Sequence, residues 1–168
     1  PFYEELGVRD GERWKQLNTN LLQIENEFYA GIRPKRIGKA GERPALALAK
    51  YGVEYVEMRL FDLNPFVDIG IVPEQSTFAD ILLLMCLFRQ SPPITAREQG
   101  ENDENKARIV NYGRQPDLNL LVHNREQPFR PIAHALFDDM QPFAHMLDVA
   151  YGGPTYATTL ASLRTRIE

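Results

Sequence analysis

The chain has 168 residues, which is enough for one domain with a sizeable hydrophobic core. Its net charge is −4 at pH 7, from 19 basic and 23 acidic residues, so it lacks the excess of cations that favours nucleic-acid binding. The only cysteine is Cys86, which excludes an internal disulfide framework and a metal site built from several cysteines.

The apolar run 81–88 surrounds Cys86 and favours a buried, inert thiol over a reactive one. The run is too short to span a bilayer and no secretory signal is visible, so we expect a cytoplasmic protein without membrane association. The chain opens on Pro1 without a methionine and stops inside a helical pattern without a capping signal. We therefore expect this chain to be a segment of a longer polypeptide. The segment would lack the N-terminal part and the extreme C-terminus of that polypeptide.

Residues 17–32 predict the first strand of the chain. Apolar side chains share one face of this strand, and polar side chains share the other. The apolar face would hold Leu22, Ile24 and Phe28, and the polar face Gln23, Glu25, Glu27 and Tyr29. Glu25 and Glu27 repel each other unless a cation lies between them, which makes them possible members of a charged site. Two solvated carboxylates would give the same pattern.

Three cations follow directly, in Arg33, Lys35 and Arg36 around Pro34, and the proline keeps this stretch extended. These cations could bind phosphate or a substrate carboxylate, or they could form a solvated basic loop. Residues 42–51 then predict a short helix that ends before Gly52.

Residues 53–63 predict a second strand, which ends at a turn formed by Asn64 and Pro65. Its apolar face would hold Val56, Met58 and Leu60, and its polar face Tyr55, Glu57 and Arg59. A carboxylate, a guanidinium and a phenol on one face suit a strand that lines a polar site. An edge strand with a solvated outer face is the alternative interpretation.

The C-terminal half is predicted to be mainly helical. Residues 77–90 predict a nearly all-apolar helix, 98–104 an exposed acidic link, 105–112 a further helix, and 118–122 a short apolar run before a polar loop at 123–127. Residues 132–151 predict a helix kinked or broken at Pro142, and residues 156–167 predict another. The expected fold class is α+β, with a sheet portion at 1–72 and a mainly helical portion at 73–168.

Residues 22–36 (LQIENEFYAGIRPKR) and 52–70 (GVEYVEMRLFDLNPFVDIG) closely resemble two signature blocks of bacterial glutamate–cysteine ligase, of the proteobacterial type. Residues 113–116 (GRQP) and 151–153 (YGG) fit the downstream region of that family more loosely. The resemblance implies a glutamine-synthetase-like antiparallel sheet that forms a funnel for ATP, metal and amino acids. It also implies ATP-dependent ligation of L-glutamate to L-cysteine through a γ-glutamyl phosphate, the first step of glutathione biosynthesis.

The resemblance also implies roles for three residues. Glu57 matches the family's metal-ligand glutamate, Arg59 the arginine that meets the transferring phosphoryl group, and Tyr29 a tyrosine of the cysteine pocket. Physical chemistry agrees, because phosphoryl transfer needs Mg²⁺ (or Mn²⁺) on oxygen ligands and cations around the transferred group. Glu57 and Arg59 supply one group of each kind, although Arg59 could also simply neutralise Glu57.

Further site residues are assigned on charge alone. Arg33 is the candidate for substrate binding, and the possible site charges are Glu25, Glu27, Lys35 and Arg36. One strand glutamate cannot hold two or three Mg²⁺ ions, so we expect this chain to be inactive without the remainder of the parent polypeptide. Two alternatives stay open, namely a related ligase that uses another amine acceptor and a non-catalytic interaction module on the same scaffold.

Overall fold

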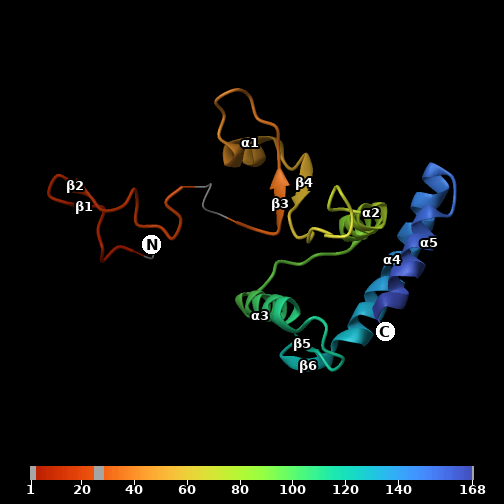
Figure 1. Cartoon of the computed structure of the whole chain (residues 1–168). Coiled ribbons are helices and arrows are strands. Elements are labelled where there is room, and N and C mark those ends of the chain that lie inside the picture. Colours follow the sequence, from red (N-terminus) through yellow and green to blue (C-terminus); the bar gives the residue numbers. More distant parts are fainter. Residues whose placement is uncertain (1–2, 25–28, 168) are drawn as a thin grey trace. The chain divides into compact units, whose positions relative to one another are not determined.

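The computed structural model describes residues 3–24 and 29–167 (Figure 1). The chain divides into two units, Pro1–Leu63 and Asn64–Glu168. Both units mix helices with two-stranded antiparallel sheets, so the predicted α+β class is confirmed at this level. None of the helices in the described part of the chain combines the length and the apolar character needed to cross a lipid bilayer.

In its described residues, the first unit contains two short antiparallel strand pairs and one α-helix. Its elements are β1 (Arg9–Asp10), β2 (Arg13–Trp14), β3 (Ile32–Lys35), α1 (Pro44–Tyr51) and β4 (Tyr55–Met58). Helix α1 confirms the prediction for residues 42–51, and Gly52 ends it with a φ of 75°, a left-handed conformation that favours glycine. Strand β4 confirms the central strand but is shorter than the predicted 53–63.

The predicted first strand at 17–32 is wrong for most of its described length, because the strand begins only at Ile32. Side-chain amides explain the difference at 17–24. The Oε1 atom of Gln23 accepts hydrogen bonds from the backbone N–H groups of Leu17 (2.8 Å) and Asn18 (3.2 Å), and Asn18 Oδ1 accepts one from Asn20 N–H at 2.8 Å. Such local bonds compete with strand pairing for the same backbone groups. Residues 25–28 lie outside the described residues.

The basic segment 33–36, which the sequence also allowed as a loop, supplies most of strand β3 instead. Strand β3 pairs with β4 in antiparallel register, with Arg33 opposite Glu57 and Lys35 opposite Tyr55. Pro34 fits because its fixed φ suits an extended backbone, and a two-stranded sheet has two edges where a missing N–H is tolerated. The antiparallel pairing of the two signature blocks is thus present, although it is shorter than predicted.

The second unit is mainly helical. Its elements are α2 (Pro73–Phe88), α3 (Ala96–Tyr112), β5 (Asn119–Val122), β6 (Arg125–Pro128), α4 (Phe129–Tyr151), α5 (Thr155–Arg164) and the 3₁₀ helix η2 (Thr165–Ile167). Helices α2, α4 and α5 pack together around a core formed by Ile81, Met85, Phe137, Met140, Ala144 and Leu160. Figure 1 shows α4 and α5 running side by side.

Three predictions of secondary structure for this unit are corrected. The acidic stretch 98–104 belongs to helix α3, because Thr95 and Glu98 form a capping box that starts the helix before it. The loop at 123–127 is a tight turn at His123 and Asn124, both with positive φ, followed by strand β6. Helix α4 continues through Pro142, since Met140 and Ala144 on either side are buried in the core and packing holds the helix together.

Cys86 is exposed, so its predicted burial is wrong. Helix α2 turns Ile81 and Met85, which are four residues apart, toward the core. Cys86 is rotated about 100° from Met85 around the helix axis and therefore lies off that face. The apolar run around the cysteine is thus only partly a core segment.

Candidate active site on strands β3 and β4

The register of β3 and β4 brings the charged residues of the two signature blocks onto one face. Directly opposed residues in an antiparallel pair project to the same side, so Arg33 shares a face with Glu57, and Lys35 shares it with Tyr55. The Arg59 N–H donates to the Gly31 carbonyl at 2.7 Å and extends this pairing by one step. A Cβ atom at Gly31 would come within 2.5 Å of the Leu60 side chain, so a larger residue there would force that side chain to move.

Glu57 is held between two cations. Its Oε1 atom accepts a hydrogen bond from Arg59 Nη2 at 3.0 Å, and its Oε2 atom lies 3.4 Å from Lys35 Nζ. The hydrogen bond from Arg59 is the main cause that lowers the pKa of Glu57, aided by the positive charges of Arg59 and Lys35 and opposed by partial burial. The carboxylate is therefore ionised at neutral pH and carries a fixed negative charge between two positive ones.

Tyr29 completes this cluster. The Arg59 guanidinium carbon lies 5.9 Å from the centre of the Tyr29 ring, within the range of a cation–π contact. The ring is 66% exposed, so one side of it remains open to a ligand. The structure thus brings together Tyr29, Glu57 and Arg59, the three residues to which the resemblance gave roles.

The remaining candidates separate into three groups. Arg33 lies opposite Glu57, and its guanidinium has no ion pair within residues 3–24 and 29–167. Arg36 belongs to another contact, since it pairs with Glu54 at 3.8 Å and lies 5.6 Å from the Tyr51 ring centre. Glu25 and Glu27 lie outside the described residues.

The contact of Lys35 with Glu57 is the detail that sequence reasoning could not assign. Lys35 is directly opposite Tyr55, which places it diagonally across the ladder from Glu57, within reach of a long side chain. Alternation along β4 predicted which face Glu57 occupies, but only the β3–β4 register specifies the cation beside it. The contact could have been predicted from the sequence only if the register in which the two signature blocks pair had been known.

Comparison with known proteins then identifies the family. The family model described as "Glutamate-cysteine ligase" matches residues 1–109, which include the whole β3–β4 cluster. The chain belongs to the glutamate–cysteine ligase family.

Curated ligases of this family resemble the chain over its whole length. A glutamate–cysteine ligase from Azotobacter vinelandii is 43% identical over 166 residues, covering 98% of this chain and 31% of the relative. One from Alcanivorax borkumensis is 40% identical, covering 100% of this chain and 33% of the relative. The chain therefore spans about a third of the length of the ligases it matches.

A solved ligase has the same fold over this region. The crystal structure of a glutamate–cysteine ligase from Francisella tularensis, in complex with AMP, matches with a TM-score of 0.80 and 32% identity, over 98% of this chain and 33% of that one. The likeness extends across the mixed helices and small sheets described above. The local structure of this chain is thus that of the corresponding third of a glutamate–cysteine ligase.

A metal site of this ligase family would need more ligands than the described residues supply. Within residues 3–24 and 29–167, no group of three or more histidine, cysteine, aspartate or glutamate side chains is close enough to hold a metal ion. Glu57 nevertheless fits as a single ligand. Its Oε2 atom is shielded from solvent and has no hydrogen-bond partner among the described residues, because Lys35 contacts it only as an ion pair. A carboxylate oxygen is the donor that Mg²⁺ prefers.

Proposed function

We propose that a ligase containing this chain joins L-glutamate to L-cysteine at the expense of ATP, through a γ-glutamyl phosphate. An oxygen of the γ-carboxylate attacks the γ-phosphorus of ATP, the bond to the β–γ bridging oxygen breaks, and ADP leaves. The amine of cysteine then attacks the acyl carbon, phosphate leaves, and the amine loses a proton. The product, γ-glutamylcysteine, is the precursor expected for glutathione.

The observation that carries the proposal is the Glu57 carboxylate held between Arg59 and Lys35 in a segment matched by the family model. Phosphoryl transfer relies on positioned cations around the transferred group, because charge is spread over its equatorial oxygens. In the proposal Arg59 donates to those oxygens. Glu57 and Tyr29 restrict the guanidinium from two sides, which positions it before the substrate arrives.

The other side chains of the face have proposed substrate roles. Tyr29, with its exposed ring, contacts the cysteine substrate. Arg33, whose guanidinium lacks an ion pair among the described residues, binds a substrate carboxylate, a group that arginine can hold by two parallel hydrogen bonds. Arg59 is the main group that keeps Glu57 ionised, and Lys35 assists it and adds positive potential on the same face.

Glu57 would also hold Mg²⁺ or Mn²⁺ through its Oε2 atom. When bound, such an ion neutralises charge on the phosphate oxygens. The remaining oxygen ligands would come from outside the described residues, since these contain no complete ligand group. The binding of ATP together with the metal ion is therefore expected to require the longer polypeptide.

The proposed fold of that polypeptide is a glutamine-synthetase-like antiparallel sheet to which β3 and β4 contribute two strands. The apolar face of the pair is only partly covered here, with Ile32, Val56 and Leu60 between 43% and 57% exposed. Two strands alone are marginally stable, and exposed strand edges favour the addition of further strands. Both features support the proposal that the remainder of a ligase covers this sheet.

The proposal is tested by phosphate release from a full-length ligase that carries this sequence, with ATP, Mg²⁺, glutamate and cysteine. Glu57→Gln is expected to lower turnover by about 100-fold or more, because the substitution removes a charge that positions Arg59 and binds metal. The matched control is Glu54→Gln, since Glu54 instead accepts from the Ile37 N–H at 3.0 Å and pairs with Arg36. This control is expected to remain near wild-type activity.

Four outcomes would contradict the proposal. Unchanged turnover in Glu57→Gln would remove Glu57 from the active site. Wild-type turnover that prefers 2-aminobutyrate or another amine to cysteine would favour a related amine ligase, and no turnover at all would favour a non-catalytic module. Normal ligation by the 168-residue chain alone would disprove its dependence on the longer polypeptide.

A further inference from the structure

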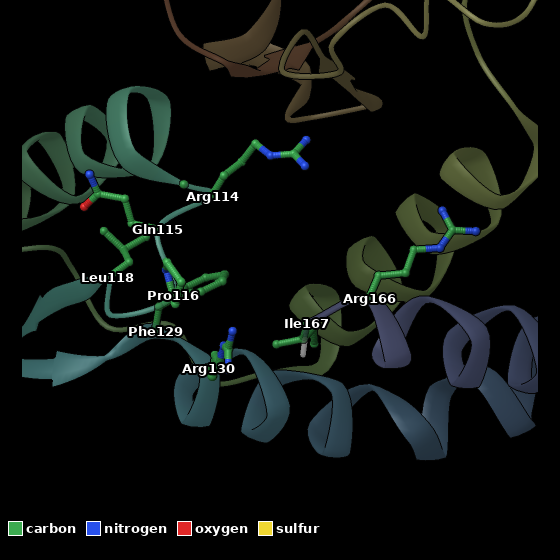
Figure 2. Close-up of a pocket in the computed structure, with 9 residues that line it drawn as sticks. Arg114, Gln115, Pro116, Leu118, Phe129, Arg130, Arg166 and Ile167 are labelled. Carbon is green, nitrogen blue, oxygen red and sulfur yellow. The ribbon is translucent and has the colours of Figure 1, made fainter.

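A second concave site lies in the helical unit, in residues that the proposed ligation does not use. It is a pocket of about 540 Å³ where the turn after α3 meets the first turn of α4 and helix η2 (Figure 2). The size is within the range of small-molecule sites. All of its lining residues are numbered 113 or higher and so lie beyond the region matched by the family model.

Backbone hydrogen bonds hold the pocket's turn in place. The Gln115 N–H donates to the Tyr112 carbonyl at 2.9 Å, which folds the chain back directly after α3. The Leu118 N–H then donates to the Gln115 carbonyl at 3.3 Å, and the Phe129 N–H donates to the Leu118 carbonyl at 2.8 Å. Leu118 is buried, so the turn that carries Arg114 is tied to the start of α4 by both hydrogen bonds and packing.

Three arginines line this pocket, namely Arg114, Arg130 and Arg166. The other arginines of the unit mostly pair with carboxylates: Arg89 with Asp139, Arg97 with Glu101, Arg108 with Glu104 and Glu126, and Arg164 with Asp138. Within residues 64–167, the arginines without such a partner are the three in the pocket and Arg125. Unpaired guanidinium groups are therefore concentrated at the pocket, where no acidic side chain among residues 64–167 lines the wall.

The three guanidinium groups are spread around the pocket. Figure 2 shows Arg114 on the turn and Arg166 on η2 at opposite sides, with Arg130 at the start of α4. They do not converge on one point, so an anion with a single charged group could not contact all of them. A ligand with several separated anionic groups could, and it would relieve the mutual repulsion of the three cations.

We propose that this pocket binds a small organic polyanion, through oxyanion groups held by Arg114, Arg130 and Arg166. Arginine suits phosphate and carboxylate groups alike, because its planar donors match two oxygens of either. The walls formed by Leu118, Phe129 and Ile167 add apolar surface for a short carbon skeleton between the charged groups. The site is separate in sequence from the β3–β4 cluster and does not depend on the ligase proposal.

The test is calorimetric titration of the 168-residue chain at low ionic strength with two probes, inorganic pyrophosphate and citrate. Both are expected to bind saturably, and their relative affinity distinguishes a phosphate ligand from a carboxylate ligand. Arg114→Gln and Arg130→Gln are each expected to weaken the preferred probe about tenfold or more, as lost charge-assisted hydrogen bonds would. Both are surface substitutions, and circular dichroism would verify that the helices are retained.

One control makes the result specific. Arg125→Gln removes an arginine of the same unit that has no carboxylate partner among the described residues and does not line the pocket. This variant is expected to bind the probes with wild-type affinity. The proposal is overturned if neither probe binds saturably, if Arg114→Gln and Arg130→Gln leave binding unchanged, or if Arg125→Gln weakens binding as much as Arg114→Gln.

Discussion

Two glutamates illustrate how neighbouring groups determine the charge state of a side chain in this protein. Glu57 is ionised because Arg59 and Lys35 surround it, and that contact belongs to the candidate active site. Glu98 is ionised because it accepts hydrogen bonds from the Thr95 backbone N–H at 2.8 Å and the Thr95 hydroxyl at 2.7 Å. The first carboxylate is available for chemistry, whereas the second stabilises the start of a helix.

The Glu98 contact predicts a pH dependence for helix α3. The backbone and hydroxyl hydrogen bonds of Thr95 lower the pKa of Glu98, so the capping contribution is complete above the pKa of the unfolded chain, near 4.5. It is lost as the pH falls through the lower folded-state pKa. Thr95→Ala removes the hydroxyl and is expected to raise the pKa of Glu98 toward its ordinary value, as measured by NMR of the side-chain carboxyl.

The matched control for that measurement is Thr158→Ala on helix α5. Thr158 is exposed and makes no side-chain contact with Glu98 among the described residues, so the pKa of Glu98 is expected to stay at the wild-type value. An unchanged pKa in Thr95→Ala would mean that the hydroxyl contributes nothing to the capping box.

At the level of elements, the stability of the helical unit comes from the contact of α2 with α4 and α5. Ile81 on α2 and Met140 on α4 are both completely buried, and Phe78 packs against Phe137 with ring centres 5.7 Å apart. Apolar burial of this kind offsets the missing hydrogen bond at Pro142. Helix α4 thus remains continuous because of its neighbours rather than because of its own sequence.

Met140→Ala is expected to destabilise this unit by about 2–5 kcal/mol, since a buried methionine leaves a cavity that the helices only partly fill. The measurement is urea unfolding followed by the helical circular dichroism signal. Met146→Ala on the same helix is the control, because Met146 is 50% exposed, and its loss is expected to cost less than about 1 kcal/mol. Equal losses in the two variants would show that α4 does not pack through Met140.

Across the whole chain, buried apolar surface is distributed unequally. Among the described residues, Ala47 is the only buried hydrophobic residue of the first unit, whereas the second unit contains all the others. Burial of one alanine contributes little against the entropy of ordering a strand pair. The strand pair that carries the candidate active site is therefore the less stable part of this chain, and α4 belongs to the more stable part.

Amide exchange tests this difference. In the 168-residue chain, the Arg59 and Glu54 amides, which bond to Gly31 and Lys35, are expected to exchange about 100-fold faster or more than the Ala144 amide of α4. The measurement is hydrogen–deuterium exchange followed by NMR. In a full-length ligase the Arg59 and Glu54 amides are expected to become protected as the sheet is extended. Equal protection of both units in the short chain would refute the argument from burial.

Local sequence patterns predicted a substantial part of this protein's secondary structure and candidate site. Helix α1 followed from Pro44 and Gly52 at its ends, and the shared face of Glu57 and Arg59 followed from alternation along β4. The two signature blocks indicated the family before any geometry was known. These features depend on residues within a few positions of one another, where backbone geometry relates sequence spacing directly to direction in space.

Other features became clear only in the folded chain. Side-chain amides replace the predicted strand at 17–24, the register of β3 with β4 selects Lys35 as the second cation beside Glu57, and helix packing leaves Cys86 exposed. The arginine pocket likewise depends on a turn, a helix start and a 3₁₀ helix that are far apart in the sequence. The register, the pocket and the exposure of Cys86 depend on residues that are far apart in the sequence. The amide bonds at 17–24 are local, and they replace the strand because they compete with it for the same backbone groups. Sequence by itself determined the local elements and the family, and only the folded chain decided which partners meet.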